Sequence, residues 1–369
     1  MGDVSLREKV YGCIVGSHVG SAMGAPVEGF SWKEVEKKYN GLLDSLQPYH
    51  HYGNLNDWTR EPGTTEDGIE RQKLMISAIL DKGDRFTAQD LKYAWAKYMN
   101  PNAGGVISEP FEPALLSIAK TSIPGSEIGA YCDYAGLCSF ARSSHPIGLI
   151  NAGDVEGAIR DTFDVGMIYH APYTRSLYWA LVVTAGIAEA TKPGATVDSV
   201  IKTILTVLRE QTKNEEKFVS GGLSIPKEAE RAIMIADKCS SINELRNEFD
   251  KYYNGFGMQY SISQANEVCS KGLAIFKMLK GNTKDAIIAA VNMGRDTDCL
   301  AAVAGGLSGA LTGASSVPGE WISQCDYAAS INPHTNTQRS MREHADGIYG
   351  AINNKIKKMK AYVSVMENA

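Results

Sequence analysis

The chain has 369 residues, of which 44% are hydrophobic and 21% charged, and its formal net charge is −5. These values are typical of a soluble globular protein with a large core, and the mild acidity argues against a nucleic-acid partner, which normally requires a basic stripe. The longest strongly apolar stretch, residues 177–190, is about half of a membrane span, so we expect a buried helix there and no membrane partner.

Seven cysteines are scattered along the chain, and no two have the spacing C-x-x-C. An odd, scattered set predicts neither a disulfide framework nor a zinc ribbon, and it favours a reducing cytoplasm. The first residues, Met-Gly-Asp-Val-Ser-Leu, contain an early acid and no apolar core. This composition is not that of a secretory signal, so we expect a cytoplasmic protein.

Apolar residues recur mainly at helical spacing, and few stretches alternate as a strand would. The predicted helices span residues 6–19, 69–80, 88–99, 155–168, 177–190, 197–208, 227–236, 264–279, 285–291, 300–311 and 338–363. Two long regions have weak patterns, residues 39–68 and 100–110, and loops of this length are often functional. No linker or low-complexity block divides the chain, so the sequence predicts one all-α domain over residues 1–369.

Two acidic motifs precede predicted helices at opposite ends of the chain. Residues 63–67 are Gly-Thr-Thr-Glu-Asp, and residues 294–299 are Gly-Arg-Asp-Thr-Asp-Cys. Carboxylates and hydroxyls grouped in this way are ligands for hard cations such as Mg²⁺, Mn²⁺ or Ca²⁺. If the fold brings the motifs together, they form a carboxylate-rich metal site that can hold sugar hydroxyls and polarise a water molecule.

Each motif also has a simpler interpretation. Thr64 or Thr65 could cap the helix that follows, and Asp296 could cap the second helix. The occurrence of two such motifs in one all-α chain favours the metal site, because a cation would offset the repulsion among crowded carboxylates. For the same reason, replacing Asp67 or Asp298 by asparagine is not expected to destabilise the metal-free fold.

The chain resembles the ADP-ribosylglycohydrolase superfamily in four segments, which follow in the family's order between about residues 6 and 365. Residues 12–29 (GCIVGSHVGSAMGAPVEG) look like its first helix, and residues 65–67 match its Thr-Asp-Asp-Thr motif. Residues 142–154, which begin with RSSHPIGLI, look like its central Arg-x-x-Pro-hydrophobic-Gly segment. Residues 296–299, with the small-residue helix behind them, are similar to its C-terminal Asp-x-Asp-Thr motif.

The resemblance implies a fold, a cofactor and an activity. The fold is a single-domain orthogonal helical bundle, and the cofactor is a pair of Mg²⁺ ions, with Mn²⁺ as the alternative. The activity is hydrolysis of the bond at the anomeric carbon of an ADP-ribosyl group, either on a small molecule or on a protein. The implied metal ligands are Thr65, Glu66, Asp67, Asp296, Asp298 and Cys299. Glu28 falls where some members carry a mobile glutamate near the scissile bond.

The sequence departs from the family pattern at positions that matter for metal binding. Glu66 replaces an aspartate, and the extra methylene would move its carboxylate by about 1.5 Å or force another pose. Gly68 replaces the second threonine, and Cys299 places sulfur where Mg²⁺ prefers oxygen. We therefore expect one of the two metal positions to be altered, weakened or unfilled, and a related ribosyl N-glycoside is an alternative substrate.

The expected chemistry follows from the positive charge that develops at C1 and the ring oxygen of the sugar when a ribosyl bond is cleaved. Asp67 or Asp298 would assist a metal-held water, and Glu28 would act as acid–base or gate; the alternative for Glu28 is an ordinary surface acid. In the weak region 39–68, four residues are candidate substrate contacts: His50, His51, Tyr52 and Trp58. Aromatic rings there could stack on a nucleobase, although packing in a lid or core is an equal alternative.

These expectations converge on a metal-dependent N-glycoside hydrolase. The rival is a catalytically silent protein of the same fold that binds an ADP-ribose-like or nucleoside ligand, suggested by the substitutions at Glu66, Gly68 and Cys299. Three aspartates of the two motifs are retained (Asp67, Asp296 and Asp298), which favours the enzyme.

Overall fold

The computed structural model describes residues 4–50, 59–99, 112–131, 137–213, 224–253 and 263–368. The helices of the first half are α1 (Leu6–Gly24), η1 (Ala25–Val27), α2 (Trp32–Tyr39), α3 (Asp67–Lys82), α4 (Ala88–Tyr98), α5 (Glu112–Ala119), η2 (Gly125–Tyr131), η3 (Ala141–Ser143), α6 (His145–Ile150), α7 (Val155–Gly166) and α8 (Arg175–Ala190). Those of the second half are α9 (Val197–Gln211), α10 (Ile225–Lys238), α11 (Ile242–Tyr253), α12 (Ala265–Met278), α13 (Thr283–Val291), α14 (Thr297–Thr312), α15 (Gly319–Ile331) and α16 (Met341–Glu367).

The all-α prediction is confirmed, and each predicted helix is present with shifted ends. In the weak region 39–68, two very short strands, β1 (Tyr49–His50) and β2 (Thr59–Arg60), pair antiparallel. The helices that the periodicity missed are α2, α5, α6, α11 and α15. Of these, α2 buries only Val35 and is stabilised instead by a capping box between Ser31 and Glu34, so it has no apolar stripe for the periodicity to detect.

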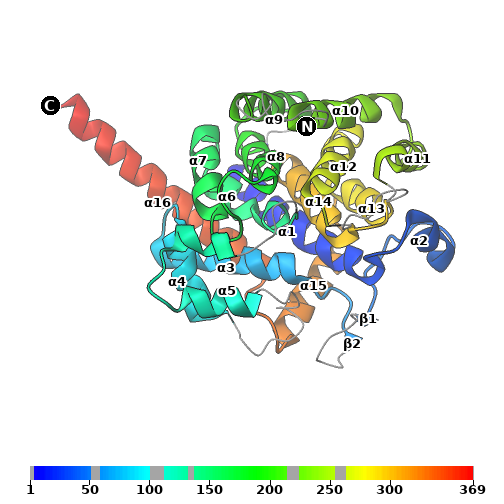
Figure 1. The fold of residues 1–369 in the computed structure, drawn as a ribbon, viewed down its shortest axis with the longest axis horizontal. Helices are drawn as coiled ribbons and strands as arrows, with labels where there is room; N and C mark the ends of the chain where they lie inside the picture. Colours follow the sequence, from blue (N-terminus) through cyan, green and yellow to red (C-terminus); the bar gives the residue numbers. More distant parts are fainter. Residues whose placement is uncertain are drawn as a thin grey trace.

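Helices α1 and α14 lie side by side at the centre of the molecule, with the other helices around them (Figure 1). Glycines recur every fourth residue over residues 12–24 of α1. A Cβ added at Gly16 would lie 2.0 Å from the backbone oxygen of Gly305, and one at Gly24 would lie 2.5 Å from the Cα of Asp298. The absence of side chains therefore lets the two backbones touch, and the C-terminal end of α1 lies against the first turn of α14.

The segment after α1 is fixed to the turn before α14. Thr297 Oγ1 donates to the carbonyl of Gly24 at 2.8 Å, and the amide of Gly29 donates to the carbonyl of Arg295 at 2.8 Å. Gly294 has φ +71°, and a Cβ there would lie 2.3 Å from the amide nitrogen of Trp32, so this crossing requires glycine. These contacts hold Glu28 beside the second acidic motif.

Helix α16 extends beyond the body of the molecule and ends at the C-terminus (Figure 1). Its first half is packed, with Ile348 and Ile352 buried, whereas Tyr362 and Val365 in the second half are exposed. Among the described residues, no helix is both long enough and apolar enough to cross a membrane.

Candidate functional site

The two acidic motifs form helix starts, as predicted. Helix α3 begins at Asp67 with Glu66 at its N-cap, and α14 begins at Thr297 with Asp296 at its N-cap. Neither N-cap side chain accepts a hydrogen bond from its own helix. Asp296 therefore occupies the N-cap position without a capping bond from its side chain, and neither Thr64 nor Thr65 is the N-cap of α3.

One arginine joins the two motifs. Arg142 lies in η3 and is only 6% exposed. Its Nη2 is 2.7 Å from Asp67 Oδ1, and its Nη1 is 3.2 Å from Asp298 Oδ2. The same Nη1 donates to Cys299 Sγ at 2.9 Å. The start of α3 and the start of α14 thus meet in one buried site.

The other oxygen of Asp67 is also paired, since Asp67 Oδ2 lies 3.0 Å from Arg71 Nη2 one turn along α3. Burial by itself favours the protonated carboxyl, but the guanidinium groups of Arg142 and Arg71 hold the pKa of Asp67 below its usual range. Asp67 is therefore an ionised carboxylate with a cationic partner on each of its oxygens.

A second group of carboxylates includes the two aspartates at the start of α14. Glu28, Asp296 and Asp298 each offer an oxygen, and these atoms all lie within 4.8 Å of one another. Within the described part of the chain, Asp296 Oδ1 and Asp298 Oδ1 are buried and accept no hydrogen bond. Unsatisfied buried carboxylate oxygens are costly, so this group is short of positive charge.

The pKa values of the group show the same deficit. Burial and the neighbouring Asp296 raise the pKa of Glu28 to about 9. Burial and the nearby Glu28 and Asp296 raise the pKa of Asp298 well above its usual range, in spite of Arg142. Like charges at short range disfavour ionisation, so a bound cation would stabilise the ionised cluster.

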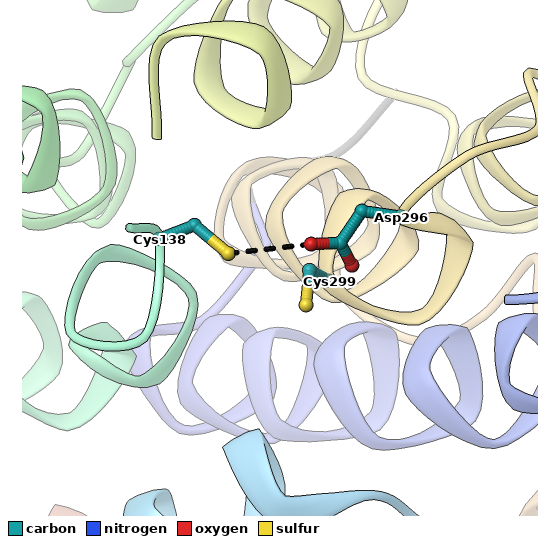
Figure 2. Close-up of side chains that lie close together, drawn as sticks. All are labelled: Cys138, Asp296 and Cys299. Atoms are coloured by element: carbon teal, nitrogen blue, oxygen red, sulfur yellow. Dashed lines mark hydrogen bonds between the residues drawn. The ribbon is translucent and has the colours of Figure 1, made fainter. Parts of the chain in front are cut away.

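Two cysteine thiols, those of Cys138 and Cys299, lie close to the Asp296 carboxylate, as Figure 2 shows. Cys138 Sγ donates to Asp296 Oδ2 at 3.5 Å, and ligand atoms of Cys138, Asp296 and Cys299 all lie within 4.8 Å of one another. Burial is the main cause that raises the pKa of the Cys299 thiol well above its usual range. Both sulfurs are in contact with charged groups as protonated thiols, and neither has the low pKa of a reactive cysteine.

The remaining predicted ligands, Glu66 and Thr65, are less favourably placed for binding a metal ion. The hydroxyl of Tyr49 donates to Glu66 Oε1, and the amide of Glu66 donates to Ser21 Oγ at 3.3 Å. Thr65 is half-buried just before α3. Tyr49 is itself buried, with Arg60 5.3 Å above its ring, so its hydroxyl orients Glu66.

A cavity of about 360 Å³ adjoins the carboxylate cluster, and its lining includes Glu28, Phe30, Lys38, Tyr49 and His50. His50 therefore borders the same space as Glu28, where a substrate contact is expected. The other three candidate contacts, His51, Tyr52 and Trp58, lie outside the described residues. Lys38 adds a positive charge to the lining, suited to an anionic part of a ligand.

Sequence reasoning missed the roles of Arg142, Arg71 and Cys138. Arg142 was contained in the central family-like segment, yet nothing in its spacing linked it to the acids. The available signal was the pair of departures at Gly68 and Cys299, because both positions contact Arg142 in the fold.

The residues present fit one hard cation. Oxygen ligands of an octahedral Mg²⁺ lie about 3 Å apart in neighbouring positions and about 4.2 Å apart in opposite ones. The oxygens of Glu28, Asp296 and Asp298 all lie within 4.8 Å of one another, close to this scale, and Asp296 and Asp298 each carry an unsatisfied oxygen. Asp67 does not fit in the same way, because both of its oxygens already pair with arginines.

Comparisons with known proteins agree with this architecture. The chain is 25% identical over 320 residues to an uncharacterized protein of Archaeoglobus fulgidus, covering 86% of this chain and 91% of the relative. A solved structure described as an ADP-ribosylglycohydrolase-related protein complex superposes with a TM-score of 0.58 at 17% identity, covering 94% of this chain and 99% of that one. This likeness shows the fold. The family model for ADP-ribosylglycohydrolase matches residues 3–356, and the chain therefore belongs to the ADP-ribosylglycohydrolase family.

Proposed function

We propose that this protein is a metal-dependent hydrolase that cleaves the N-glycosidic bond of an ADP-ribosyl or related ribosyl substrate. The observation that carries the proposal is the group formed by Glu28, Asp296 and Asp298, in which two buried carboxylate oxygens lack a partner and Glu28 lines a cavity. Family membership supports the hydrolase class. The metal, taken as Mg²⁺ or Mn²⁺, and the substrate are parts of the proposal.

Glu28, Asp296 and Asp298 would hold the cation. When bound, such an ion supplies positive charge that orients sugar hydroxyls and acidifies a water molecule. Glu28 also lines the cavity, so it is the member of this group that borders the space for a substrate, and it would exchange a proton with the substrate only while it is not bound to the cation. Asp298 also contacts Arg142 through Oδ2, and this contact fixes the orientation of its carboxylate.

Charge and shape in the cavity support a ribosyl ligand. Lys38 and His50 border the space on the side of α2 and β1. A cation at the rim can pair with a phosphate of an ADP-ribosyl group, and a plain ribonucleoside would lack this contact. The volume of about 360 Å³ is within the usual range for a small-molecule site.

The test is direct measurement of turnover on ADP-ribosyl conjugates and on ribonucleosides, with Mg²⁺, with Mn²⁺ and with EDTA. We expect release of ADP-ribose or ribose only with a divalent ion. Asp296→Asn should abolish release, because it removes charge from the cation-binding group. Turnover that is equal in EDTA, or unaffected by Asp296→Asn, would contradict the proposal.

One observation favours a second candidate, a silent ADP-ribose- or nucleoside-binding protein. Asp67 is withdrawn into two buried ion pairs, which removes a carboxylate that the family resemblance assigns to metal binding and to water activation. This candidate predicts calorimetric binding of ADP-ribose without turnover of any ribosyl conjugate. Metal-dependent turnover by the wild-type protein would exclude it.

A further inference from the structure

We infer that the guanidinium of Arg142 replaces one of the two cations that the resemblance implies, so that the centre binds a single divalent ion at Glu28, Asp296 and Asp298. The inference rests on the proposed metal dependence. It concerns how many ions are bound and which residues bind them.

Arg142 contacts three of the six side chains that the resemblance implies as metal ligands. These contacts are 2.7 Å to Asp67, 3.2 Å to Asp298 and 2.9 Å to the sulfur of Cys299. A guanidinium is permanently positive and presents several N–H donors in one plane. It therefore neutralises carboxylates from both motifs, as a bridging cation would, without requiring oxygen at position 299.

The departure at Gly68 makes room for this arginine. A Cβ added at Gly68 would lie 2.9 Å from Arg142 Cδ, 3.0 Å from Nε and 3.1 Å from Nη1. The threonine that the family carries at this position would displace the Arg142 side chain, since it adds two further heavy atoms beyond the Cβ. Gly68 and Arg142 thus form a matched pair, and Cys299 completes it as the neighbour of Nη1.

Arg142 is held in this position from its backbone outward. Its amide donates to the carbonyl of Cys138 at 2.9 Å, and its carbonyl accepts from Gln72 Nε2 at 3.2 Å. Although burial opposes the charged form, Asp67 and the other acidic neighbours raise the pKa of Arg142 further above its usual range. The arginine is therefore a fixed, fully charged part of the core.

The group that remains for a cation is distinct from these contacts. Asp298 uses Oδ2 toward Arg142 and keeps Oδ1 without a partner, and Asp296 keeps Oδ1 in the same state. With Glu28 they provide one compact set of oxygens. Asp67 is not part of this set, and each of its oxygens already contacts a guanidinium.

Counting bound ions tests the inference. Mn²⁺ binding is followed by the electron paramagnetic resonance signal of free Mn²⁺, and Mg²⁺ binding by calorimetry. We expect one ion per wild-type chain, lost in Asp296→Asn and retained in Asp67→Asn. We expect two ions in the triple variant Gly68→Thr/Arg142→Met/Cys299→Thr, which removes the guanidinium and restores oxygen ligands. Arg85→Met is the matched control, because it breaks a different arginine–aspartate pair, with Asp161, and should leave one ion.

Two ions in the wild-type protein, or one ion in a folded triple variant, would overturn the inference and leave the metal-dependent function intact. No ion in the wild-type protein would overturn both. If the triple variant does not fold without metal, Gly68→Thr alone provides the second measurement. This variant should displace Arg142, so its ion count or its ion affinity should differ from that of the wild-type protein. An unchanged Mn²⁺ titration in folded Gly68→Thr would also count against the inference.

Discussion

Asp67 and Arg142 form a buried ion pair, with 2.7 Å between Oδ1 and Nη2, although they come from different helices. Arg71 contacts the second oxygen of the same carboxylate. The carboxylates of the two acidic motifs are thus not a uniform repulsive cluster. Asp67 is neutralised by the protein itself, whereas Glu28, Asp296 and Asp298 lie close together, and Asp296 and Asp298 each keep one unsatisfied oxygen.

This asymmetry changes what asparagine substitutions should do to the metal-free fold. Asp67→Asn removes the carboxylate that two buried guanidinium groups share, although Arg142 keeps its contact with Asp298, and breaking a buried pair typically costs about 3–5 kcal/mol. The sequence alone leads us to expect that neither Asp67→Asn nor Asp298→Asn destabilises the metal-free protein. With the structure, we keep this expectation only for Asp298→Asn, because burial and the nearby Glu28 and Asp296 raise the pKa of Asp298. Denaturant unfolding in EDTA should show a large loss for Asp67→Asn and a small change for Asp298→Asn.

The reverse order of stabilities would show that the Arg142 pairs contribute less than the repulsion around Asp298. Arg142→Met provides a consistency check, because it should destabilise the metal-free protein as Asp67→Asn does, and the double variant should cost less than the sum of the two.

Cys299→Thr should leave Mg²⁺ affinity unchanged when it is introduced alone. The sequence by itself predicts tighter binding, because threonine restores an oxygen ligand. In the fold, however, the side chain at 299 faces Arg142 Nη1 at 2.9 Å, and the guanidinium keeps a second ion away. Calorimetric titration of both proteins measures this, and tighter binding by Cys299→Thr would show that this side chain reaches the bound ion.

The contact between α1 and α14 predicts a strong position dependence of glycine substitutions. A Cβ at Gly20 would lie 2.3 Å from the carbonyl oxygen of Ala301, whereas one at Gly350 in α16 would have nothing within 4 Å. Gly20→Ala should therefore lower the free energy of unfolding by about 1–3 kcal/mol, the usual cost of overpacking. Gly350→Ala should stabilise it by up to about 1 kcal/mol, because alanine favours the helix. Thermal melting of both variants decides the matter, and a neutral Gly20→Ala would contradict the close backbone packing.

The sequence predicted the helical fold and placed a helix start just after each acidic motif, at residues 69 and 300, within three residues of the observed starts at Asp67 and Thr297. Apolar periodicity and acidic N-terminal residues are local signals. The sequence could not predict the partner of each carboxylate. Arg142 reaches Asp67 and Asp298 only through the packing of η3 against α3 and α14, and such contacts have no signature in residue spacing. Asp296 occupies the N-cap position of α14 but makes no capping bond, and one of its oxygens accepts instead from Cys138, which is distant in sequence.

The carboxyl group of Glu28 should give the metal-free protein an unusual pH dependence of its stability. Its pKa is about 9 in the folded state, compared with 4.5 for the free side chain, mainly because of burial and then Asp296. Between pH 5 and pH 9, on this reasoning, the folded state keeps a proton that the unfolded state has lost. Stability falls with rising pH wherever the folded state binds more protons. The free energy of unfolding in EDTA should therefore decrease across this window, by at most about 1.4 kcal/mol per pH unit from this group, and level off above pH 9.

Glu28→Gln is the matched comparison, because glutamine resembles the protonated carboxyl and does not titrate. Its stability in EDTA should decrease less steeply between pH 5 and pH 9, with Asp298 responsible for what remains, since its pKa is also raised. Saturating Mg²⁺ should remove the decrease in the wild-type protein, because the ion favours the ionised carboxylates. Urea unfolding at a series of pH values provides the measurement. Equal slopes for the wild-type protein and Glu28→Gln would mean that Glu28 ionises normally and lies outside the carboxylate cluster in solution.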